Sequence, residues 1–331
     1  MTGTFRALVV REQQDGTFTR TLESLTAGDL PPGEVLIRVD FSSLNYKDAL
    51  SATGNRGVTR KYPHIPGVDA AGVVEESGDP RHAPGTPVLV TGYELGSNHW
   101  GGFARYARVP AEWVVPLPPP LTPRRSMAYG TAGFTAALGV HKLRHEGVQP
   151  GDGPVVVTGA TGGVGCIAVG MLAKLGYEVV AVSGKPAAAD LLRTLGASAV
   201  LPREELHDTT PRALLAGRWA GGIDTVGGTM LHTILRGVKT GGSVACCGNV
   251  VGHELHTSVY PFILRGVNLL GIGSAWTAMP LRLEIWGLIA GAWDVPGLEA
   301  LVREVPLDAL EPEIAAILRG GQTGRVVVRC G

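Results

Sequence analysis

The chain has 331 residues, which favours two domains, and 44% of them are hydrophobic, enough for a substantial core. Its 29 Lys and Arg residues are balanced by 29 Asp and Glu residues. Because no basic excess is available to attract nucleic acid or an anionic membrane, we expect neither of these as a partner.

The chain contains four cysteines, Cys166, Cys246, Cys247 and Cys330, and no C-x-x-C pair. Cys246 and Cys247 lie in an apolar run typical of a strand, where adjacent side chains point to opposite faces. We therefore expect no disulfide framework and a reducing, cytoplasmic location. Residues 1–16 show no secretion-signal pattern, and no long uncharged apolar run indicates a membrane span.

The pattern of residues 1–122 indicates a β-rich domain, because short apolar runs such as RALVV and EVLIRVDF alternate with Gly and Pro turns. The segment PLPPPLTP, residues 116–123, is predicted to end this domain. Proline removes a backbone donor and is excluded from helix interiors and from central sheet ladders.

From Ser126 onwards the pattern becomes an alternation of strands and helices. Strands are predicted at residues 154–158, 178–182, 199–201, 223–226 and 243–247, and helices at 164–175 and 187–195. Such alternation is typical of a parallel sheet with helices on both faces. Residues 266–272 are a further strand candidate and residues 281–291 a helix candidate. The final segment GRVVVRC is an expected strand that returns to the first domain.

The strongest local motif is VVVTGATGGVG, residues 155–165, which has the strand–turn–helix context of a dinucleotide-binding fingerprint. Aligned on G-x-G-x-x-G, the first glycine is replaced by Ala160, whereas Gly162 and Gly165 are retained. The predicted phosphate contacts are Gly162, Gly163, Val164 and Gly165, at a helix N-terminus whose unpaired N–H groups favour an anion. An ordinary tight turn is the alternative.

The residues after the second predicted strand indicate which dinucleotide is bound. NAD sites commonly place an acidic residue there to hold the ribose hydroxyls. Here the chain has Ser183, Gly184 and Lys185, which offer a hydroxyl, an amide and a cation. These groups suit a 2′-phosphate, so we predict NADPH as the cofactor. The alternative is that Lys185 is an ordinary solvated lysine.

Several motifs together resemble the medium-chain dehydrogenase/reductase superfamily and, more closely, its YhdH/YhfP-type quinone oxidoreductases, which include NADPH-dependent acrylyl-CoA reductases. The motifs are SSLNYKDALSATG (42–54), YPHIPGVDAAGVV (62–74), NHWGGFARYARV (98–109), GTAGFTA (130–136) and PFILRGVNLLGI (261–272). They occur in order and cover nearly the whole chain.

This resemblance implies an α/β protein in which a GroES-like, β-rich catalytic domain accompanies a Rossmann domain with a doubly wound parallel sheet. We expect residues 1–122 and 259–331 to form the GroES-like domain and residues 123–258 to form the NADP-binding Rossmann domain. The resemblance also implies a homodimer.

Zinc is not expected. Zinc alcohol dehydrogenases of this superfamily take catalytic ligands from a first-domain cysteine and from a His-Glu pair in a G-H-E segment. The matching segment here is Pro66–Asp69, without histidine, and no cysteine precedes Cys166. His64, His82 and His99 are scattered. Reduction of a conjugated carbonyl needs only polar donors and one weak acid.

The candidate catalytic residues are Asn45, Tyr46 and Asp48 in the cluster Asn45–Asp48. Tyr46 is expected to bond the nicotinamide ribose or carboxamide region, or to deliver a proton. Asn45 is a candidate donor to a carbonyl oxygen. Asp48 either takes part in a proton relay, if burial raises its pKa, or caps a helix. His99 is a weaker candidate acid.

The remaining predicted cofactor contacts lie further along the chain. Gly248 and Asn249 follow a predicted strand end, where ligands gather in open parallel sheets. Thr131 and Thr135 are expected on a helix, in contact with nicotinamide or in helix packing. Ser274 is a contact suggested by the resemblance. Arg203 is a candidate for adenine or the 2′-phosphate, since Ala199 stands where close relatives often carry arginine.

The sequence therefore predicts a zinc-independent NADPH reductase of the C=C bond of a short α,β-unsaturated acyl-CoA, such as acrylyl-CoA. The alternatives are an NADPH:quinone or enone oxidoreductase and, in another class, a non-catalytic NADPH-binding structural protein. Arg56, Arg60 and Lys61 are candidate contacts for coenzyme A phosphates, or an ordinary solvated charge cluster.

Overall fold

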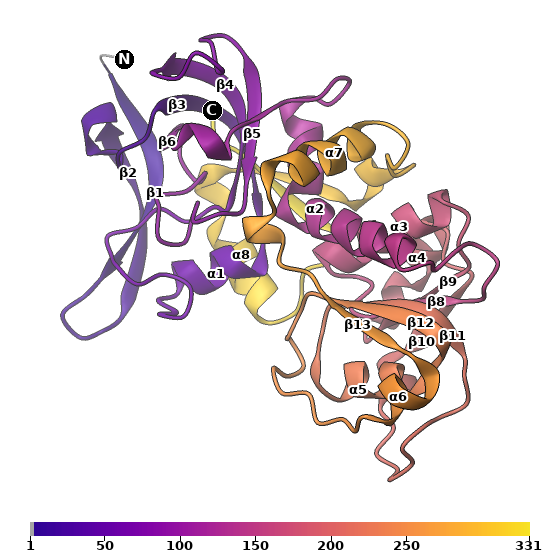
Figure 1. Ribbon diagram of the computed structural model, residues 1–331. Coiled ribbons are helices and arrows are strands. Elements are labelled where there is room, and N and C mark those ends of the chain that lie inside the picture. The colour runs from indigo at the N-terminus through magenta and orange to yellow at the C-terminus, as the bar shows by residue number, and fades with distance from the viewer. Residues whose placement is uncertain (1–2) are drawn as a thin grey trace. The chain divides into compact units, whose positions relative to one another are not determined.

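The computed structural model describes residues 3–331, which form two compact units (Figure 1). The first unit contains the chain up to Thr131 together with Ala275–Ala290 and Val302–Gly331. The second unit contains Ala132–Ser274 and Gly291–Leu301. No helix within residues 3–331 combines the length and apolarity needed to cross a bilayer.

The first unit is built on a sheet with the strand order β14-β15-β3-β4-β5-β7, and β6 also pairs with β3. A separate antiparallel hairpin is formed by β1 and β2. The strands are β1 (Thr4–Glu12), β2 (Phe18–Thr26), β3 (Val35–Leu44), β4 (Asp69–Ser77), β5 (Pro87–Thr91), β6 (Tyr106–Val109), β7 (Val115–Pro116), β14 (Val302–Pro306) and β15 (Arg325–Arg329). The helices are α1 (Tyr46–Ala52), α7 (Met279–Ala290) and α8 (Glu311–Leu318).

Apolar strand residues form the core of this unit. Val35, Ile37 and Val39 on β3 are fully buried, and they share one core cluster with Val326 and Val328 of β15. The C-terminal strand therefore returns to the first unit, as predicted, and pairs antiparallel with β3. The first unit is thus β-rich, as predicted for residues 1–122.

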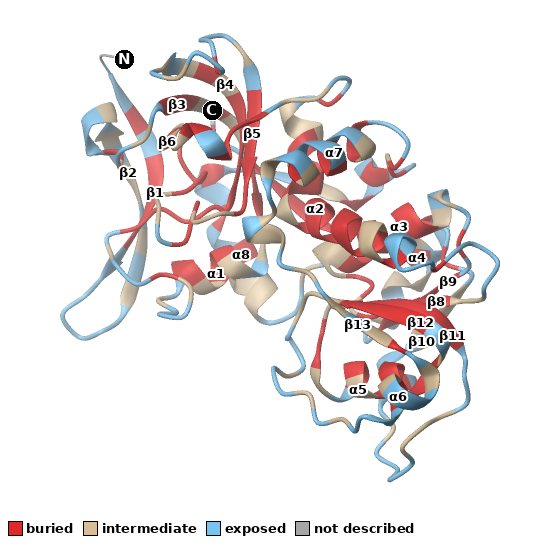
Figure 2. Ribbon diagram, in the orientation of Figure 1, coloured by how far each residue is buried: buried red, intermediate tan, exposed pale blue. Residues whose placement is uncertain are grey.

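The second unit contains a parallel sheet with the strand order β10-β9-β8-β11-β12-β13. Its strands are β8 (Val155–Val157), β9 (Val179–Ser183), β10 (Ala199–Pro202), β11 (Trp219–Asp224), β12 (Val238–Cys246) and β13 (Asn268–Gly271). The order reverses direction at β8 and β11, which makes the sheet doubly wound, as predicted. Figure 2 shows the inner strands of this sheet as largely buried, whereas the edge strands β10 and β13 are half-buried or exposed.

Helices cover both faces of the parallel sheet, with α3 and α4 on one face and α5 and α6 on the other (Figure 1). Their bounds are α3 (Gly163–Lys174), α4 (Ala189–Thr194), α5 (Gly228–Gly237) and α6 (Tyr260–Arg265). Helix α2 (Pro123–His145) contains the last residues of the first unit and the first residues of the second, with a kink at Gly130. Short 3₁₀ turns lie at Ala27–Asp29, Ala111–Trp113, Pro186–Ala188, Arg203–Leu206, Ser274–Trp276, Leu298–Leu301 and Leu307–Ala309.

The units divide the chain differently from the expected boundary at residue 259. Strand β13 pairs with β12 in parallel and completes the parallel sheet, so the chain stays in the second unit as far as Ser274. Residues Gly291–Leu301 also belong there, since Val295 packs against Gly170 of α3. The unit boundary after Ser274 has no run of prolines to mark it in the sequence. It is located by the pairing of β13 with β12.

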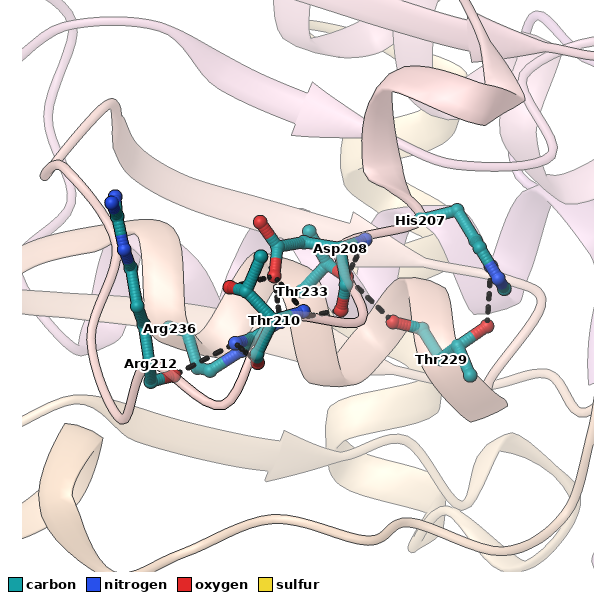
Figure 3. A network of polar contacts seen from close by, with 7 residues as sticks. All are labelled: His207, Asp208, Thr210, Arg212, Thr229, Thr233 and Arg236. Carbon is teal, nitrogen blue, oxygen red and sulfur yellow. Dashed lines mark hydrogen bonds and ion pairs between the residues drawn. The ribbon is translucent and has the colours of Figure 1, made fainter.

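The long connection from β10 to β11 is held by buried Arg236 on α5 (Figure 3). Its guanidinium donates to the carbonyl oxygens of Asp208, Thr210 and Arg212 at 2.6, 3.0 and 2.8 Å. It also bonds the Asp208 carboxylate at 2.9 Å, which compensates both charges. This loop borders a cavity of about 440 Å³ lined in part by Thr229.

Candidate functional site

The glycine-rich turn after β8 has the backbone geometry predicted for a phosphate cradle. Gly159 adopts φ +57°, and a Cβ on it would lie 2.3 Å from the Thr225 hydroxyl. A Cβ on Gly165 would lie 2.3 Å from the Gly159 carbonyl oxygen, so only glycine lets α3 approach the turn. The replacement of the first fingerprint glycine by Ala160 is tolerated because that residue is buried and donates its N–H to Val182.

Helix α3 begins at Gly163 with Gly162 as its N-cap, and the cap residue has no side chain to occupy the first N–H groups. Gly162, Gly163 and Val164 are half-buried at this end, whereas Gly165 is buried. An N-terminus of this kind offers N–H donors and a favourable dipole to an anion. The chain therefore fits a dinucleotide pyrophosphate at this turn.

Ser183, Gly184, Lys185 and Arg203 come together at the carboxyl ends of β9 and β10. The Ser183 hydroxyl accepts from the Lys185 N–H at 3.0 Å, which bends the chain sharply after β9. A Cβ on Gly184 would lie 3.2 Å from Cδ of Arg203, so the arginine side chain passes over this glycine. Burial lowers the pKa of Lys185. Residues 183–185 include no acid.

Two further predicted cofactor contacts are brought together in the second unit. The Thr135 hydroxyl of α2 donates to the Ser274 hydroxyl at 2.8 Å. Gly248 follows β12 in tight contact with Thr225, since a Cβ would lie 1.8 Å from the Thr225 carbonyl oxygen. Asn249, the next residue, is exposed. The Thr131 side chain instead bonds Asp69 within the first unit.

The cluster Asn45–Asp48 forms the start of α1, directly after β3. Asn45 is the N-cap and Asp48 the third helical residue, and the two form a capping box. The Asp48 carboxylate accepts from the Asn45 backbone N–H at 2.8 Å and from the Asn45 side-chain amide at 3.2 Å. The helix-cap interpretation of Asp48 therefore has direct geometric support.

Asp48 also reaches beyond its own helix and has no exposed surface. Its other oxygen accepts from the backbone N–H groups of Gly67 and Val68 at 3.2 and 2.7 Å. Burial, followed by repulsion from Asp69, raises the pKa of Asp48 to about 7. The raised pKa anticipated for this residue is present, but the carboxylate is enclosed by these four donor contacts.

The side chain of Asn45 is likewise engaged inside the protein. Its amide nitrogen donates to Asp69 at 2.7 Å as well as to Asp48, and its amide oxygen accepts from Arg325 at 3.1 Å. Both ends of the amide are therefore bonded to protein groups, which favours a positioning role for Asn45. Its role as a donor to a substrate carbonyl stays a prediction.

Tyr46 differs from its neighbours because 38% of its surface is exposed. It is the first residue of α1, immediately after the capping residue, so its backbone position is fixed by the contacts of Asn45 and Asp48. Within the cluster, Tyr46 combines a weakly acidic hydroxyl with access to solvent. It is the residue of the cluster that we retain as a candidate proton donor or cofactor contact.

Sequence reasoning missed three buried residues at this site: Ser43, Asp69 and Arg325. Ser43 Oγ donates to the Asp69 carboxylate at 2.5 Å and accepts from Arg325 at 2.8 Å. The available signal was an acidic residue and a basic residue inside the apolar runs VDAAGVV and GRVVVRC. Charges at such positions are rare unless they are paired.

The residues present do not fit a zinc ion. Within residues 3–331, no group of three or more His, Cys, Asp or Glu side chains is arranged to hold a metal. The three first-domain histidines are separate: His64 is buried, and His82 and His99 bond the carbonyl oxygens of Ala111 and Arg108 at 3.0 and 2.6 Å. His99 also packs on Trp113, which gives it a structural role.

In the basic cluster of Arg56, Arg60 and Lys61, Arg56 makes structural contacts within the protein. Arg56 bonds the Glu12 carboxylate at 2.5 Å and the Arg60 carbonyl oxygen at 2.9 Å, and its guanidinium lies over the ring of Tyr62. These contacts tie the loop after α1 to the hairpin of β1 and β2. Arg60 and Lys61 are exposed.

Comparison with known proteins relates both parts of the chain to dehydrogenases. Residues 31–119 match the family described as the alcohol dehydrogenase GroES-like domain, and residues 163–281 match the zinc-binding dehydrogenase family. The acrylyl-CoA reductase AcuI of Ruegeria pomeroyi is 48% identical over 98% of both chains. The zinc in the second family's description has no counterpart in the donor groups of residues 3–331.

Two further relatives are similar in sequence and structure. YhfP, a putative quinone oxidoreductase of Bacillus subtilis, is 46% identical over 99% of this chain and 100% of its own, and its structure with NAD bound gives a TM-score of 0.96. The yhdH oxidoreductase of Salmonella enterica, solved with NADP, is 44% identical over 98% of this chain and 100% of its own, with a TM-score of 0.95. The chain therefore belongs to the YhdH- and YhfP-type oxidoreductases of the medium-chain dehydrogenase/reductase superfamily.

Proposed function

We propose that the protein is an NADPH-dependent oxidoreductase that reduces the C=C bond of a short α,β-unsaturated acyl-CoA, converting acrylyl-CoA to propionyl-CoA. The observation that carries this proposal is the joint presence of a glycine-rich phosphate cradle at the start of α3 and an exposed tyrosine at the start of α1. The 48% identity to an acrylyl-CoA reductase supports the choice of substrate.

The residues of the second unit fit NADPH. The turn Gly162–Gly165 holds the pyrophosphate, and Ser183, Gly184, Lys185 and Arg203 receive the 2′-phosphate. Thr135, Gly248, Asn249 and Ser274 contact the nicotinamide end. When bound, NADPH supplies the hydride for the β-carbon of the substrate. The Salmonella relative solved with NADP supports this cofactor.

The chemistry left to the protein is modest. Hydride addition to the β-carbon of the thioester leaves an enolate, and one proton must then reach the α-carbon. The Tyr46 hydroxyl is positioned by α1 to donate a hydrogen bond or that proton. Asn45 and Asp48 hold the helix start, and the buried Asp48 keeps α1 attached to the Gly67–Val68 segment.

The test is oxidation of NADPH, followed at its nicotinamide absorbance, with acrylyl-CoA, crotonyl-CoA and a benzoquinone in parallel. Turnover that is fastest with acrylyl-CoA, with propionyl-CoA as the product, supports the proposal. The second candidate is an NADPH:quinone or enone oxidoreductase, favoured by the name of the Bacillus subtilis relative. Faster turnover of the quinone would favour that candidate.

A non-catalytic NADPH-binding protein is the candidate of another class. Such a protein would bind NADPH without oxidising it in the presence of any of the three acceptors. The exposed Tyr46 beside the buried Asn45–Asp48 capping box weighs against it, because a purely structural protein has no need for a solvent-accessible phenol on so rigid a support.

The assembly we propose is a homodimer formed through the outer surface of the second unit. This α6–β13 surface consists of Val259, Tyr260, Ile263, Leu264 and Leu269, which are 61%, 47%, 67%, 62% and 37% exposed. Within the described residues β13 pairs only with β12, so one strand edge is open. A second copy related by a two-fold axis covers both features at once.

The location we propose is the cytoplasm. Cys166, Cys246, Cys247 and Cys330 are all free thiols, and burial raises the pKa of Cys330 to about 12. Unpaired cysteines of this kind are typical of a reducing compartment. Fractionation of the cells that produce the protein, with detection by a specific antibody, tests this location.

A further inference from the structure

Asp69 is a fully buried carboxylate that accepts hydrogen bonds from three separate elements of the first unit. Ser43 at the end of β3 donates at 2.5 Å, and the Asn45 side-chain amide donates at 2.7 Å. Thr131 of α2 donates through its N–H at 2.9 Å and through its hydroxyl at 2.6 Å. Such a set of donors fixes the directions of all the groups that reach the carboxylate.

Arg325 closes this arrangement into a ring. Its guanidinium donates to Ser43 Oγ at 2.8 Å and to Asn45 Oδ1 at 3.1 Å, which are the same two residues that donate to Asp69. A third bond runs to the Ala128 carbonyl oxygen at 3.1 Å. The positive charge therefore acts on Asp69 through two intervening side chains, and a change at any member disturbs the others.

The backbone conformation and the missing side chain of Gly130 leave space for this ring of polar side chains. Gly130 has φ +52°, and a Cβ there would lie 2.5 Å from both Asp69 Oδ2 and Ser43 Oγ. The turn aims the Thr131 N–H at the Asp69 carboxylate, which accepts it at 2.9 and 3.1 Å. Gly130 and Thr131 thus act together on Asp69, which lies on a strand about sixty residues earlier: the glycine leaves space for the carboxylate and the threonine donates to it.

Asn45 links the ring to the exposed tyrosine. It is the N-cap of α1, and Tyr46 is the next residue. If the Asn45 amide turned, the cap would change and the tyrosine would shift with the first turn of the helix. Asp48, within α1, accepts hydrogen bonds from the capping residue Asn45, and Asp69, on β4, accepts another from the same residue.

We propose that Asp69 is a positioning residue of the reaction, which sets the place of the Tyr46 hydroxyl through Asn45 while it holds Thr131. This inference rests on the proposed function. Asp69 does not touch substrate or cofactor; it acts through the capping residue. Its substitution therefore changes catalysis only as long as the Tyr46 hydroxyl is present.

A double-mutant cycle tests this dependence. The enzymes are the wild type, Asp69→Asn, Tyr46→Phe and the double variant, with kcat and KM for acrylyl-CoA and the Kd of NADPH measured by nicotinamide fluorescence. We expect Asp69→Asn to lower kcat or NADPH affinity by about tenfold when Tyr46 is present and by less than about threefold in the Tyr46→Phe background. Asp40→Asn, on the neighbouring strand β3 and paired with Arg105 at 3.1 Å, is the matched control.

Equal effects of Asp69→Asn in both backgrounds, or no effect in either, would overturn the inference. If Asp69→Asn does not fold, Ser43→Ala removes one donor to the carboxylate and is used in the same cycle, with the same non-additivity expected. Failure of the wild type to turn over any acceptor contradicts the proposed function, and the cycle on NADPH affinity still decides the role of Asp69.

Discussion

The carboxylates of Asp48 and Asp69 receive hydrogen bonds from the same group, the side-chain amide of Asn45, at 3.2 and 2.7 Å. Both residues are fully buried. Burial, followed by repulsion from Asp69, raises the pKa of Asp48 to about 7. Because Asp48 is part of the capping box of α1, the start of this helix is sensitive to pH near neutrality.

The first prediction concerns the pH dependence of stability. The folded-state pKa of Asp48 lies above its ordinary value of 3.8, so the folded protein holds this proton more tightly than the unfolded chain. The contribution of Asp48 is most favourable below about pH 4 and is lost as the pH rises through about 7, by about 4 kcal/mol in all. Urea unfolding of wild type and Asp48→Asn at pH 5 to 8 measures the difference.

We expect the unfolding free energy of the wild type, relative to Asp48→Asn, to fall over that pH range and to level off above it. His64 titrates with the opposite sign, since burial lowers its pKa to about 4, but it is common to both proteins and cancels in the difference. If the difference in unfolding free energy stayed constant over this pH range, the pKa of Asp48 in the folded protein would lie outside it.

The second prediction concerns cofactor choice. Lys185→Asp replaces the cation after β9 with an acid, which repels a 2′-phosphate but accepts from ribose hydroxyls. We expect the Kd of NADPH to rise by about 10- to 100-fold and the Kd of NADH to change far less. Lys174→Asp, in the last turn of α3, carries the same charge change as a control. If the Kd values of NADPH and NADH rose equally, Lys185 would not be a contact of the 2′-phosphate.

The third prediction concerns the exposed tyrosine. Tyr46→Phe removes one hydroxyl and keeps the ring, so the fold is expected to persist. We expect kcat with acrylyl-CoA, or NADPH affinity, to fall by about 10- to 100-fold, in the range of a single acid or hydrogen-bond contribution. Tyr106→Phe on β6 is the control. Unchanged turnover together with unchanged cofactor affinity would exclude Tyr46 from the mechanism.

The fourth prediction concerns the kink of α2. Gly130→Ala introduces a Cβ into contact with Asp69 and Ser43 at a positive φ, and we expect it to destabilise the protein by about 2–5 kcal/mol. Gly287→Ala in α7 is the control, because a Cβ at Gly287 would have no atom within 4 Å and alanine favours helix. The melting temperatures of the two variants are compared by thermal unfolding. Similar values would show that a Cβ at position 130 is accommodated without strain.

The fifth prediction concerns assembly. Leu264→Glu places a charge in the α6–β13 surface, and we expect it to halve the mass measured by light scattering during gel filtration. Leu283→Glu, at an exposed leucine of α7, is the control and is expected to leave the mass unchanged. A wild type that elutes with the mass of one chain would refute the dimer directly.

Local patterns in the sequence predict much of this fold. The strands predicted at residues 154–158, 178–182 and 243–247 are found at Val155–Val157, Val179–Ser183 and Val238–Cys246, because buried parallel strands need continuous apolar residues. The glycine spacing of residues 159–165 likewise predicts the turn, since the close approach of α3 excludes a Cβ at Gly165. Family membership and the two-part architecture are confirmed by the comparisons.

What the sequence did not reveal depends on contacts between distant residues. Asp69 and Arg325 are 256 positions apart, from 325 minus 69, and no spacing rule brings them to one ring. Asn45 looks like a free donor in the sequence, but its amide is occupied by two carboxylates in the fold. The boundary near residue 259 also depended on a distant pairing, that of β13 with β12.

The position of β15 between β14 and β3 has a consequence for synthesis of the chain. Residues 325–329 are an interior strand of the first unit, and they also bring Arg325 to its partners. That sheet therefore stays incomplete until these residues have been synthesised, whereas all strands of the parallel sheet, up to Gly271, precede them in the chain. The parallel sheet is thus free to assemble before the sheet of the first unit.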